Sequence, residues 1–353
     1  MKIFQRYIIV NYIKNLLIIF ISLELFYVGV DLLSNFKDLP DSANIQLLYV
    51  VFKILDAINY TLPLSSVFAM IVTKFTMIKS NELVSMYSVG IRKNSVIAPL
   101  FLVASIFMSI FAALHFTSFT YANEYSQNLL RYSTISNSSS NLFLKDKDQY
   151  IYFKTLDPIK KNAQGIKIFE VKDNDLEKII SADNGYFFNN RWILKNVQVL
   201  YKPKALGIGD TGLKEILHDR YEALENFRPK IMDNIFKSEY TLSTLDAFDA
   251  YIFFNAQDIN TKRIRAIIYT QMFLPFFAPL LIIILFHFLP ISSRFFNLTF
   301  LSFIFTLIAL FTWGILFLLS KLSYGGVILP EIALILPLFI LALISFRVYF
   351  KSS

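Results

Sequence analysis

The sequence predicts an α-helical membrane protein with six transmembrane helices and an inserted all-β domain of jelly-roll type. Two observations favour this fold class: long apolar runs toward both ends of the chain, and a central stretch in which apolar and polar residues alternate. Of the 353 residues, 55% are hydrophobic and 17% are charged, whereas soluble globular proteins have about 25% charged residues. The clustered apolar residues therefore indicate an integral membrane protein.

A helix that crosses a bilayer needs about 20 mostly apolar residues. The segments that meet this requirement are 7–33, 47–78, 96–119, 266–289, 296–319 and 327–350. Lys2 and Arg6 precede the first run, as in a signal peptide, but the run is too long for the apolar part of one and no small-residue cleavage site follows it. We therefore interpret it as a retained span.

Lysine and arginine residues near the span ends predict the orientation in the membrane. Most fall on one side if the two termini lie together: Lys2, Arg6, Lys74, Lys79, Arg92, Lys93, Arg294, Arg347 and Lys351. We therefore expect both termini in the cytoplasm. The predicted domains are 1–120 with the first three spans, 121–265 outside the cytoplasm, and 266–353 with the last three spans.

The stretch 121–265 has the pattern of an all-β domain. A Ser-rich segment, 134–141, leads into short runs of Val, Ile, Tyr and Phe that alternate with polar residues and are separated by turn residues. Strands repeating at about 8–12 residues are typical of β-sandwiches and barrels. The period becomes helical near 242–256, where Ser243 or Thr244 can cap a connecting helix.

A short segment between the second and third spans, near 80–91, predicts an amphipathic helix on the cytoplasmic surface. Its apolar residues at i, i+3 and i+4 share one face, namely Leu83, Met86 and Tyr87. Glu82 and Ser85 are expected to point away from this face. Ser80 or Asn81 can cap the helix, and Gly90 can end it in a left-handed conformation. A plain surface linker is the alternative.

Sequence patterns for enzymes are missing from the chain. It has no G-x-x-x-x-G-K-[ST], G-x-S-x-G or H-E-x-x-H motif and no cysteine. His115, His218 and His287 are too far apart in sequence to suggest a metal site. The Lys and Arg residues form no long run, so we expect no nucleic-acid partner. We predict a protein without catalytic residues or cofactors of its own.

Glu24 lies inside the first predicted span, where an ionisable residue costs free energy and usually faces protein or a wet cavity. It either lines a substrate path, or contacts a partner helix, or forms a structural pair with Lys53 or with a Ser or Thr of another helix. Lys53, Asp56, Lys321 and Glu331 fall near the outer interface, where we expect them to extend toward water.

Four stretches of the sequence resemble the LptF/LptG permease family, the transmembrane subunits of the lipopolysaccharide exporter. They are SNELVSMYSVGIRKNSVIAPL, NLFLKDKDQYIYFKTLDP, LSTLDAFDAYIFFNAQDINTKRIRAIIYTQMFLPFFAPL, and LPISSRFFN followed by GGVILPEIALILPLFIL. In the family they correspond to the cytoplasmic helix with its basic pair, the first periplasmic strands, the entry to the fourth span, and the turn and last span. The KD-x-x-x-Y-I-Y and LPISSR pieces favour LptG over LptF.

The resemblance implies an ABC transporter subunit of the bacterial inner membrane that extracts lipopolysaccharide and passes it to a periplasmic β-bridge, in outer-membrane biogenesis. The implied partners are a companion permease (LptF if this chain is LptG), two copies of the ATPase LptB with ATP and Mg²⁺, LptC and LptA. The alternatives are a membrane scaffold that transports nothing, or another ABC permease type, such as one for lipoprotein release.

The resemblance also implies site residues. By position, the residues that couple to the ATPase are Glu82, Leu83, Met86, Tyr87 and Gly90. Basic residues near the outer end of the first span contact lipid phosphates in the family. Here only Lys37 lies there, and Asp31, Asp38 and Asp41 surround it. This difference weakens the phosphate assignment.

Two predicted strands carry apolar residues on both faces. Ile151 and Phe153 share one face of the first, and in the second Trp192 and Leu194 are expected to lie opposite Ile193 and Val197. A second apolar face suggests a partner sheet or an apolar groove. We expect Ile151, Phe153, Trp192 and Ile193 to lie on a path for acyl chains, and a sheet edge to pair with a bridge protein.

Overall fold

The chain folds into two compact units. The computed structural model describes residues 2–135, 138–146, 149–172, 175–203, 212–225, 227–229, 241–255, 260–292, 294 and 297–351. The first unit contains Met1–Ser126, Ser243–Ile252 and Asn260–Ser353. The second contains Gln127–Leu242 and Phe253–Ile259. Each unit is built on its own hydrophobic core.

The first unit is helical. Its helices are α1 Ile3–Ser34, α2 Ala43–Lys79, α3 Glu82–Ser88, α4 Lys93–Leu114, α7 Thr244–Asn255, α8 Lys262–Met272, α9 Phe277–Phe288, α10 Leu298–Tyr324 and α11 Leu336–Lys351. Short helical turns are η1 Phe36–Asp38, η2 Ser118–Tyr121, η3 Leu274–Phe276 and the π-helical turn η4 Glu331–Ile335. Helix α5, Ala122–Tyr132, leads into the second unit.

The described helices include five that are long and apolar enough to cross a membrane: α1, α2, α4, α10 and η4 with α11. Helices α8 and α9 pass the same test together, with a bend of 41° between them, and raise the number to six if they form one span. Pro275 lies in the bend, where its ring interrupts the helical hydrogen bonds. The predicted membrane-helical class is therefore confirmed.

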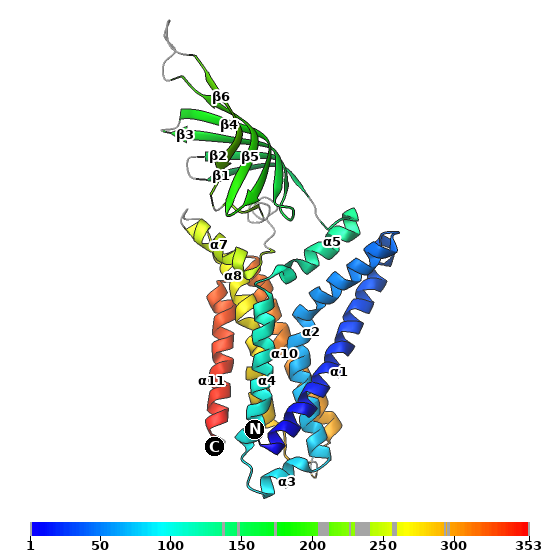
Figure 1. Ribbon diagram of the computed structural model, residues 1–353. Coiled ribbons are helices and arrows are strands. Elements are labelled where there is room, and N and C mark those ends of the chain that lie inside the picture. The colour runs from blue at the N-terminus through cyan, green and yellow to red at the C-terminus, as the bar shows by residue number, and fades with distance from the viewer. Residues whose placement is uncertain are drawn as a thin grey trace. The chain divides into compact units, whose positions relative to one another are not determined.

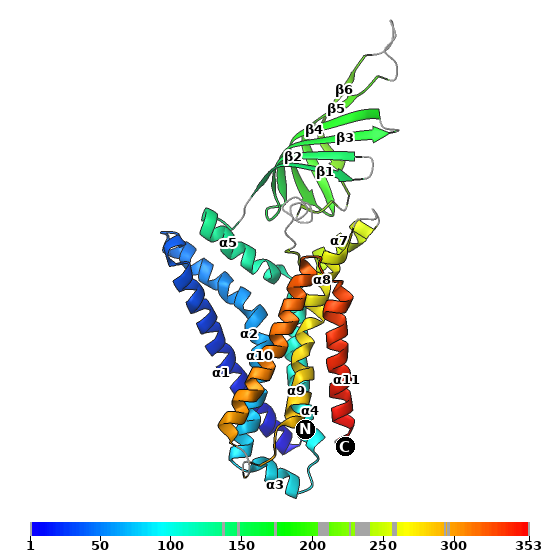
Figure 2. The same ribbon diagram turned by 180° about the vertical axis from the view of Figure 1, so that it is seen from behind.

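Helix α2 is the central helix of the bundle. It packs against α1, α9 and α10, and most of its apolar segment is buried, whereas α1 and α10 leave most of theirs exposed. Exposed apolar faces of this length suit contact with lipid. Figures 1 and 2 show that α1 begins and α11 ends at the end of the bundle that carries α3.

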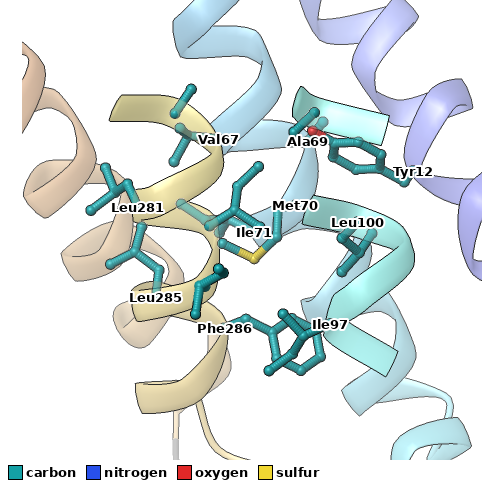
Figure 3. Close-up of a cluster of buried hydrophobic side chains, with 14 of the residues drawn as sticks. Tyr12, Val67, Ala69, Met70, Ile71, Ile97, Leu100, Leu281, Leu285 and Phe286 are labelled. Carbon is teal, nitrogen blue, oxygen red and sulfur yellow. The ribbon is translucent and has the colours of Figure 1, made fainter. Parts of the chain in front are cut away.

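The core of the helical unit lies where α2, α4 and α9 meet. Figure 3 shows the side chains of these helices interlocked, among them Met70, Leu100 and Leu285. Tyr12 of α1 closes one side, and its hydroxyl contacts Ser66 of α2 at 2.8 Å. The buried tyrosine thus keeps a hydrogen bond, as a buried polar group must.

The second unit contains a six-stranded antiparallel sheet whose strands follow one another in chain order. The strands are β1 Ser139–Asp146, β2 Gln149–Asp157, β3 Asn162–Lys172, β4 Asp175–Phe188, β5 Arg191–Tyr201 and β6 Lys214–Ala223. The predicted all-β domain is present, and the jelly-roll topology stays a prediction.

At one position in each strand, the alternation of side chains between the two faces of the sheet reverses, and these positions lie side by side across the sheet. We call these positions the crease row: Asn141, Lys154, Gly165, Asp183, Asn196 and Asp219. Backbone φ is positive at Asn141, Gly165 and Asn196, in alternate strands. On one side of Gly165, Ile166 is buried, and on the other side Ala163 is buried. Both residues therefore reach the same core, although strict alternation would separate them.

The crease row corrects the expected facing in β5. The prediction placed Trp192 and Leu194 opposite Val197, because strict alternation puts odd and even positions on opposite faces. In the structure all three belong to one core cluster, and only Ile193 lies on the other face. Asn196, with φ of 53°, reverses the alternation between Leu194 and Val197.

The sheet is strongly curled. Strands β2 and β5 are separated by two others, so their residues would be about 14 Å apart in a flat sheet. The rings of Phe153 and Trp192 nevertheless lie 5.3 Å apart between centroids. The apolar face is therefore concave and closes around its own side chains.

Candidate functional site

Helix α3 connects the ends of α2 and α4 and is held in place by local backbone geometry. Gly90 has φ of 84°, the Gly90 amide donates to Tyr87 and the Ile91 amide donates to Met86 at 3.1 Å. This is the Schellman arrangement that ends helices at glycine, as predicted for Gly90. At the start, Asn81 has φ of 60° and its side chain does not cap the helix.

The predicted capping role of Ser80 was also wrong. The Ser80 hydroxyl donates to the Thr76 carbonyl of α2, at 3.0 Å, and so continues the preceding helix. A left-handed residue between two helices turns its side chain away from the amides of the second one. The two helices are therefore joined by a fixed turn.

The apolar face of α3 packs on the chain's own bundle. Leu83 is completely buried in the core, and Met86 and Tyr87 pack against it. Val84 of α3 is exposed away from this core, and Val89, the C-cap residue after α3, is 82% exposed. Any partner of α3 would therefore meet Val84 and Val89 first, while Leu83, Met86 and Tyr87 fix the helix to its own bundle.

Glu82 is directed toward α1. Its Oε1 accepts a hydrogen bond of 2.9 Å from the Tyr7 hydroxyl. Within the described part of the chain, its Oε2 is buried without a hydrogen-bond partner. Glu82 thus links the start of α3 to the start of the first span and retains an unused acceptor.

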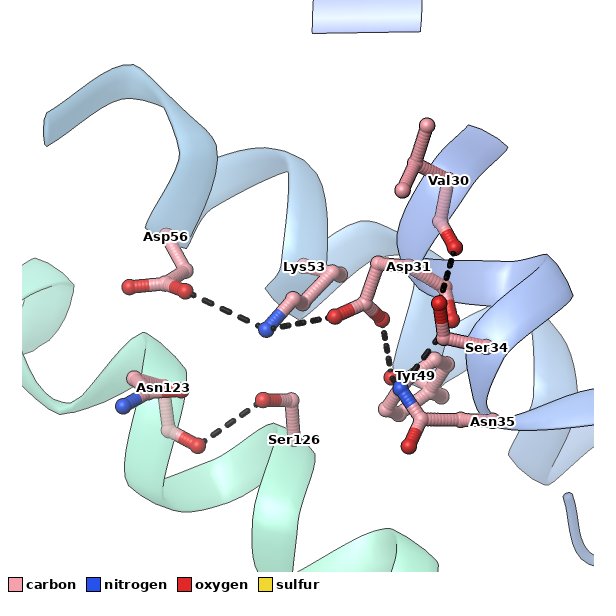
Figure 4. Close-up of polar contacts among 9 residues, drawn as sticks. All are labelled: Val30, Asp31, Ser34, Asn35, Tyr49, Lys53, Asp56, Asn123 and Ser126. Carbon is pink, nitrogen blue, oxygen red and sulfur yellow. Dashed lines mark hydrogen bonds and ion pairs between the residues drawn. The ribbon is translucent and has the colours of Figure 1, made fainter. Parts of the chain in front are cut away.

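A charged network lies at the opposite end of α1 and α2 (Figure 4). The Lys53 amine lies 3.0 Å from Asp31 and 3.4 Å from Asp56, and the Tyr49 hydroxyl donates to Asp31. The Lys53 side chain is only 6% exposed. The expectation that Lys53 and Asp56 extend to water was therefore wrong, because each finds an opposite charge inside the protein.

Glu24 is 7% exposed and belongs to the contact between α1 and α2. The Thr61 hydroxyl donates to its Oε1, so the observed partner is the threonine of another helix and not Lys53. Its Oε2 has no hydrogen-bond partner among the described residues. Lys37 is exposed in η1 and takes no part in the network at this end.

The four β-domain residues predicted to contact lipid are all buried. Ile151, Phe153 and Trp192 share the concave core, and Ile193 lies on the other face. The Trp192 indole donates to the Phe227 carbonyl at 2.7 Å. The structure therefore brings three of the four together, within a core that the chain itself fills.

A polar junction at the start of α7 was missed by sequence reasoning. The Tyr121 hydroxyl donates to Asp246, and the Thr244 hydroxyl donates to Gln271 of α8 at 2.8 Å. The Thr244 amide also donates to the His115 carbonyl at 2.9 Å. Burial, with the nearby Asp246 carboxylate, raises the pKa of Tyr121 and keeps it a donor.

The Asp246 amide donates to the Ser243 hydroxyl at 3.2 Å, which caps α7 as the sequence allowed. The long-range contacts of this junction leave no local sequence signal. A buried tyrosine and a capping motif more than 100 residues apart are joined only by the fold.

A comparison with protein-family models matches residues 6–351 to the lipopolysaccharide export system permease LptF/LptG. The match covers both the helices of the first unit and the sheet of the second. No curated protein matches the chain.

Proposed function

Because the chain belongs to the LptF/LptG family of lipopolysaccharide export permeases, we propose that it is a permease subunit of an ABC transporter, of the LptG type. It extracts lipopolysaccharide from the inner membrane and passes it toward the outer membrane. The observation that carries the proposal is the family match over 6–351. Its partners are a companion LptF-type permease, an LptB ATPase dimer, LptC and the bridge protein LptA.

The subunit works without catalytic residues or a cofactor of its own. The chain has no phosphate-binding loop, so ATP and Mg²⁺ are bound by the partner ATPase. Helix α3 is the coupling helix that meets this ATPase. This role is supported by the exposed side chains of Val84 and Val89, while the other face of α3 is packed in the bundle.

In the proposed topology α8 and α9 form one bent span, and the chain crosses the membrane six times. Both termini and α3 are cytoplasmic, and the predicted domain 121–265 is periplasmic with a jelly-roll-like sheet. The Lys and Arg distribution supports this orientation. Helix α1 begins and α11 ends at the same end of the bundle, which supports placing both termini on one side of the membrane (Figure 1).

The proposed lipid path runs along the apolar concave face of the sheet, which contains Ile151, Phe153 and Trp192. Because the chain's own side chains fill this core, they must separate to admit acyl chains. Acyl chains in the periplasm need a lining that excludes water, and this face supplies it. The edge strand β1 is a place where a bridge protein can add a strand. Glu24 and Lys37 lie beside the membrane part of the path.

Purification of the tagged chain tests the proposal directly. Mass spectrometry of the purified proteins and lipids is expected to find an ATPase, a companion permease and lipopolysaccharide at fixed ratios. Val89→Asp places a charge on the exposed face of α3 and is expected to lower ATPase recovery at least tenfold while the companion permease remains. Asn190→Asp, in the turn after β4, is the matched control.

A chain that purifies without any ATPase would instead support the scaffold alternative. Orientation is tested separately, because the chain has no native cysteine. Asn190→Cys should react with an impermeant thiol reagent in cells whose outer membrane is permeabilised, and Ser85→Cys should not. The reverse labelling pattern would exclude the proposed topology.

A further inference from the structure

Lys74 is the most deeply buried charged residue of α2. It is 0% exposed, and its amine donates to the carbonyls of Phe286 and Leu289, the latter at 2.7 Å. The amine also lies 4.1 Å from the centroid of the Phe286 ring. Phe286 lies in the last turn of α9, and Leu289 is the C-cap residue that follows this helix, before Pro290.

Lys93 makes a similar contact from the other side of α3. It is the first residue of α4, and its amine donates to the His287 carbonyl at 2.8 Å. Neither lysine forms an ion pair with a carboxylate within the described ranges. We call Lys74 and Lys93 the lysine clamp. They lie on the two helices that α3 connects, and both bind the end of one third helix.

The lysine clamp supplies hydrogen-bond donors to the backbone carbonyls at the end of α9. The last carbonyls of a helix have no partner within it, and they carry the negative end of the helix dipole. Burial without donors would be costly for them. A lysine amine at the end of a flexible side chain offers N–H donors to such carbonyls. The contact is therefore specific for the end of α9.

Besides the apolar packing of Leu83, Met86 and Tyr87, two single hydrogen bonds among the described residues join the α3 region to α1 and α11. Tyr7 of α1 binds Glu82, and Asn94 of α4 binds the Tyr349 carbonyl of α11 at 2.9 Å. By contrast, three carbonyls at the end of α9 are bound by two lysine side chains. Among these described contacts, α9 therefore receives the most side-chain hydrogen bonds.

We propose that Lys74 and Lys93 are positioning residues that fasten the bent span α8–α9 to the α2–α3–α4 hairpin, so that displacement of α3 moves this span first. The inference rests on the proposed function, in which an ATPase displaces α3. At its other end the span meets α7 through Gln271 and Thr244. Movement applied at α3 therefore reaches the helix that leads back from the β domain.

Coupling of ATP hydrolysis to lipid release tests the clamp. The purified complex in proteoliposomes is compared with its Lys74→Met variant, in which methionine keeps a long apolar side chain but removes every donor. We expect lipid released per ATP to fall at least fivefold while ATP hydrolysis stays within twofold. Lys79→Met, at an exposed position in the last turn of α2, is the matched control and should change neither.

An unchanged ratio of release to hydrolysis, or a proportional loss of both, would overturn the proposal. Lys93→Met, at a partly buried position, is the second variant and should lower the same ratio. If the unmodified complex hydrolyses ATP but releases no lipid, the proposed function fails. The clamp is then judged by a measurement on the chain alone.

That measurement is the distance between spin labels at Val89→Cys in α3 and Phe288→Cys in α9, both exposed positions in a chain without native cysteine. We expect one narrow distance distribution with the intact clamp. Adding Lys74→Met should broaden it and add a second, longer distance. Identical distributions in both proteins would contradict the clamp, whatever the transport activity.

Discussion

Lys53 and Lys74 lie on the same helix, α2, and both are buried, but the protein satisfies them in opposite ways. At the end away from α3, Lys53 sits between two carboxylates, Asp31 and Asp56. At the α3 end, Lys74 donates to backbone carbonyls at the end of α9 and forms no ion pair with a described carboxylate. The first contact joins neighbouring helices of one hairpin. The second joins elements more than 200 residues apart.

The difference predicts how each end of α2 responds to the loss of its lysine. A lysine between carboxylates neutralises charges that would be stranded without it, so its loss leaves buried ions. A lysine on carbonyls satisfies neutral groups, so its loss leaves unmet hydrogen bonds only. We therefore expect the end with Lys53 to govern stability, and the end with Lys74 to govern how helices move together.

The largest effect is expected for Lys53→Met. It leaves the buried Asp56 and the partly buried Asp31 without their cation, which costs about 3–5 kcal/mol of unfolding free energy. Unfolding in detergent measures this loss. Lys37→Met, at an exposed site near the same end, is the control and should change little. Equal unfolding free energies of the two variants would show that the ion pairs of Lys53 do not govern stability.

Lys74→Met should cost less, about 1–3 kcal/mol, because the groups left behind are neutral carbonyls. The same detergent unfolding experiment gives the number, with Lys79→Met as reference. A larger loss of unfolding free energy than that of Lys53→Met would mean that the end with Lys74, and not the end with Lys53, governs stability.

A smaller effect is expected for Tyr7→Phe, which removes the hydrogen bond to Glu82 and leaves the ring in place. A hydrogen bond of this kind contributes about 0.5–1.5 kcal/mol. Hydrogen exchange of the α3 amides should increase in this variant, since α3 loses a link to α1. Unchanged exchange would show that the apolar face of α3 holds this helix without the Tyr7 hydrogen bond.

The smallest effect is expected for Glu24→Gln. The amide can still accept from Thr61, and the change removes a buried negative charge that has no ion-pair partner among the described residues. Stability should stay within about 1 kcal/mol, and lipid release should be unchanged. A tenfold loss of release with normal folding would instead show that the Glu24 carboxylate takes part in lipid passage.

Features with a local physical cause could be predicted from the sequence. Apolar length predicts membrane helices, and Gly90 supplies the left-handed residue that ends α3. The partners of Lys53 and Lys74 could not be predicted in this way. Both lysines looked like interfacial charges, because only the folded bundle brings Asp31 or the end of α9 to them.

In the sheet, the sequence also could not predict every contact, because it did not show which face each side chain takes. Alternation identified its strands, but it assigned Val197 to the wrong face because the reversal at Asn196 depends on backbone conformation. Asparagine tolerates positive φ more readily than most residues, yet many asparagines in this chain have ordinary conformations. The aligned row across the strands becomes visible only when their pairing is known.

The crease row also restricts how the chain can gain or lose residues during evolution. Deleting one residue between Gly165 and the end of β3 would turn the following side chains to the opposite face, while the other strands kept theirs. Adding a Cβ at Gly165 itself would bring it within 2.7 Å of the Lys154 Cβ. Length changes in the sheet are therefore confined to its turns, and the strand segments of related sequences should align across the crease without gaps.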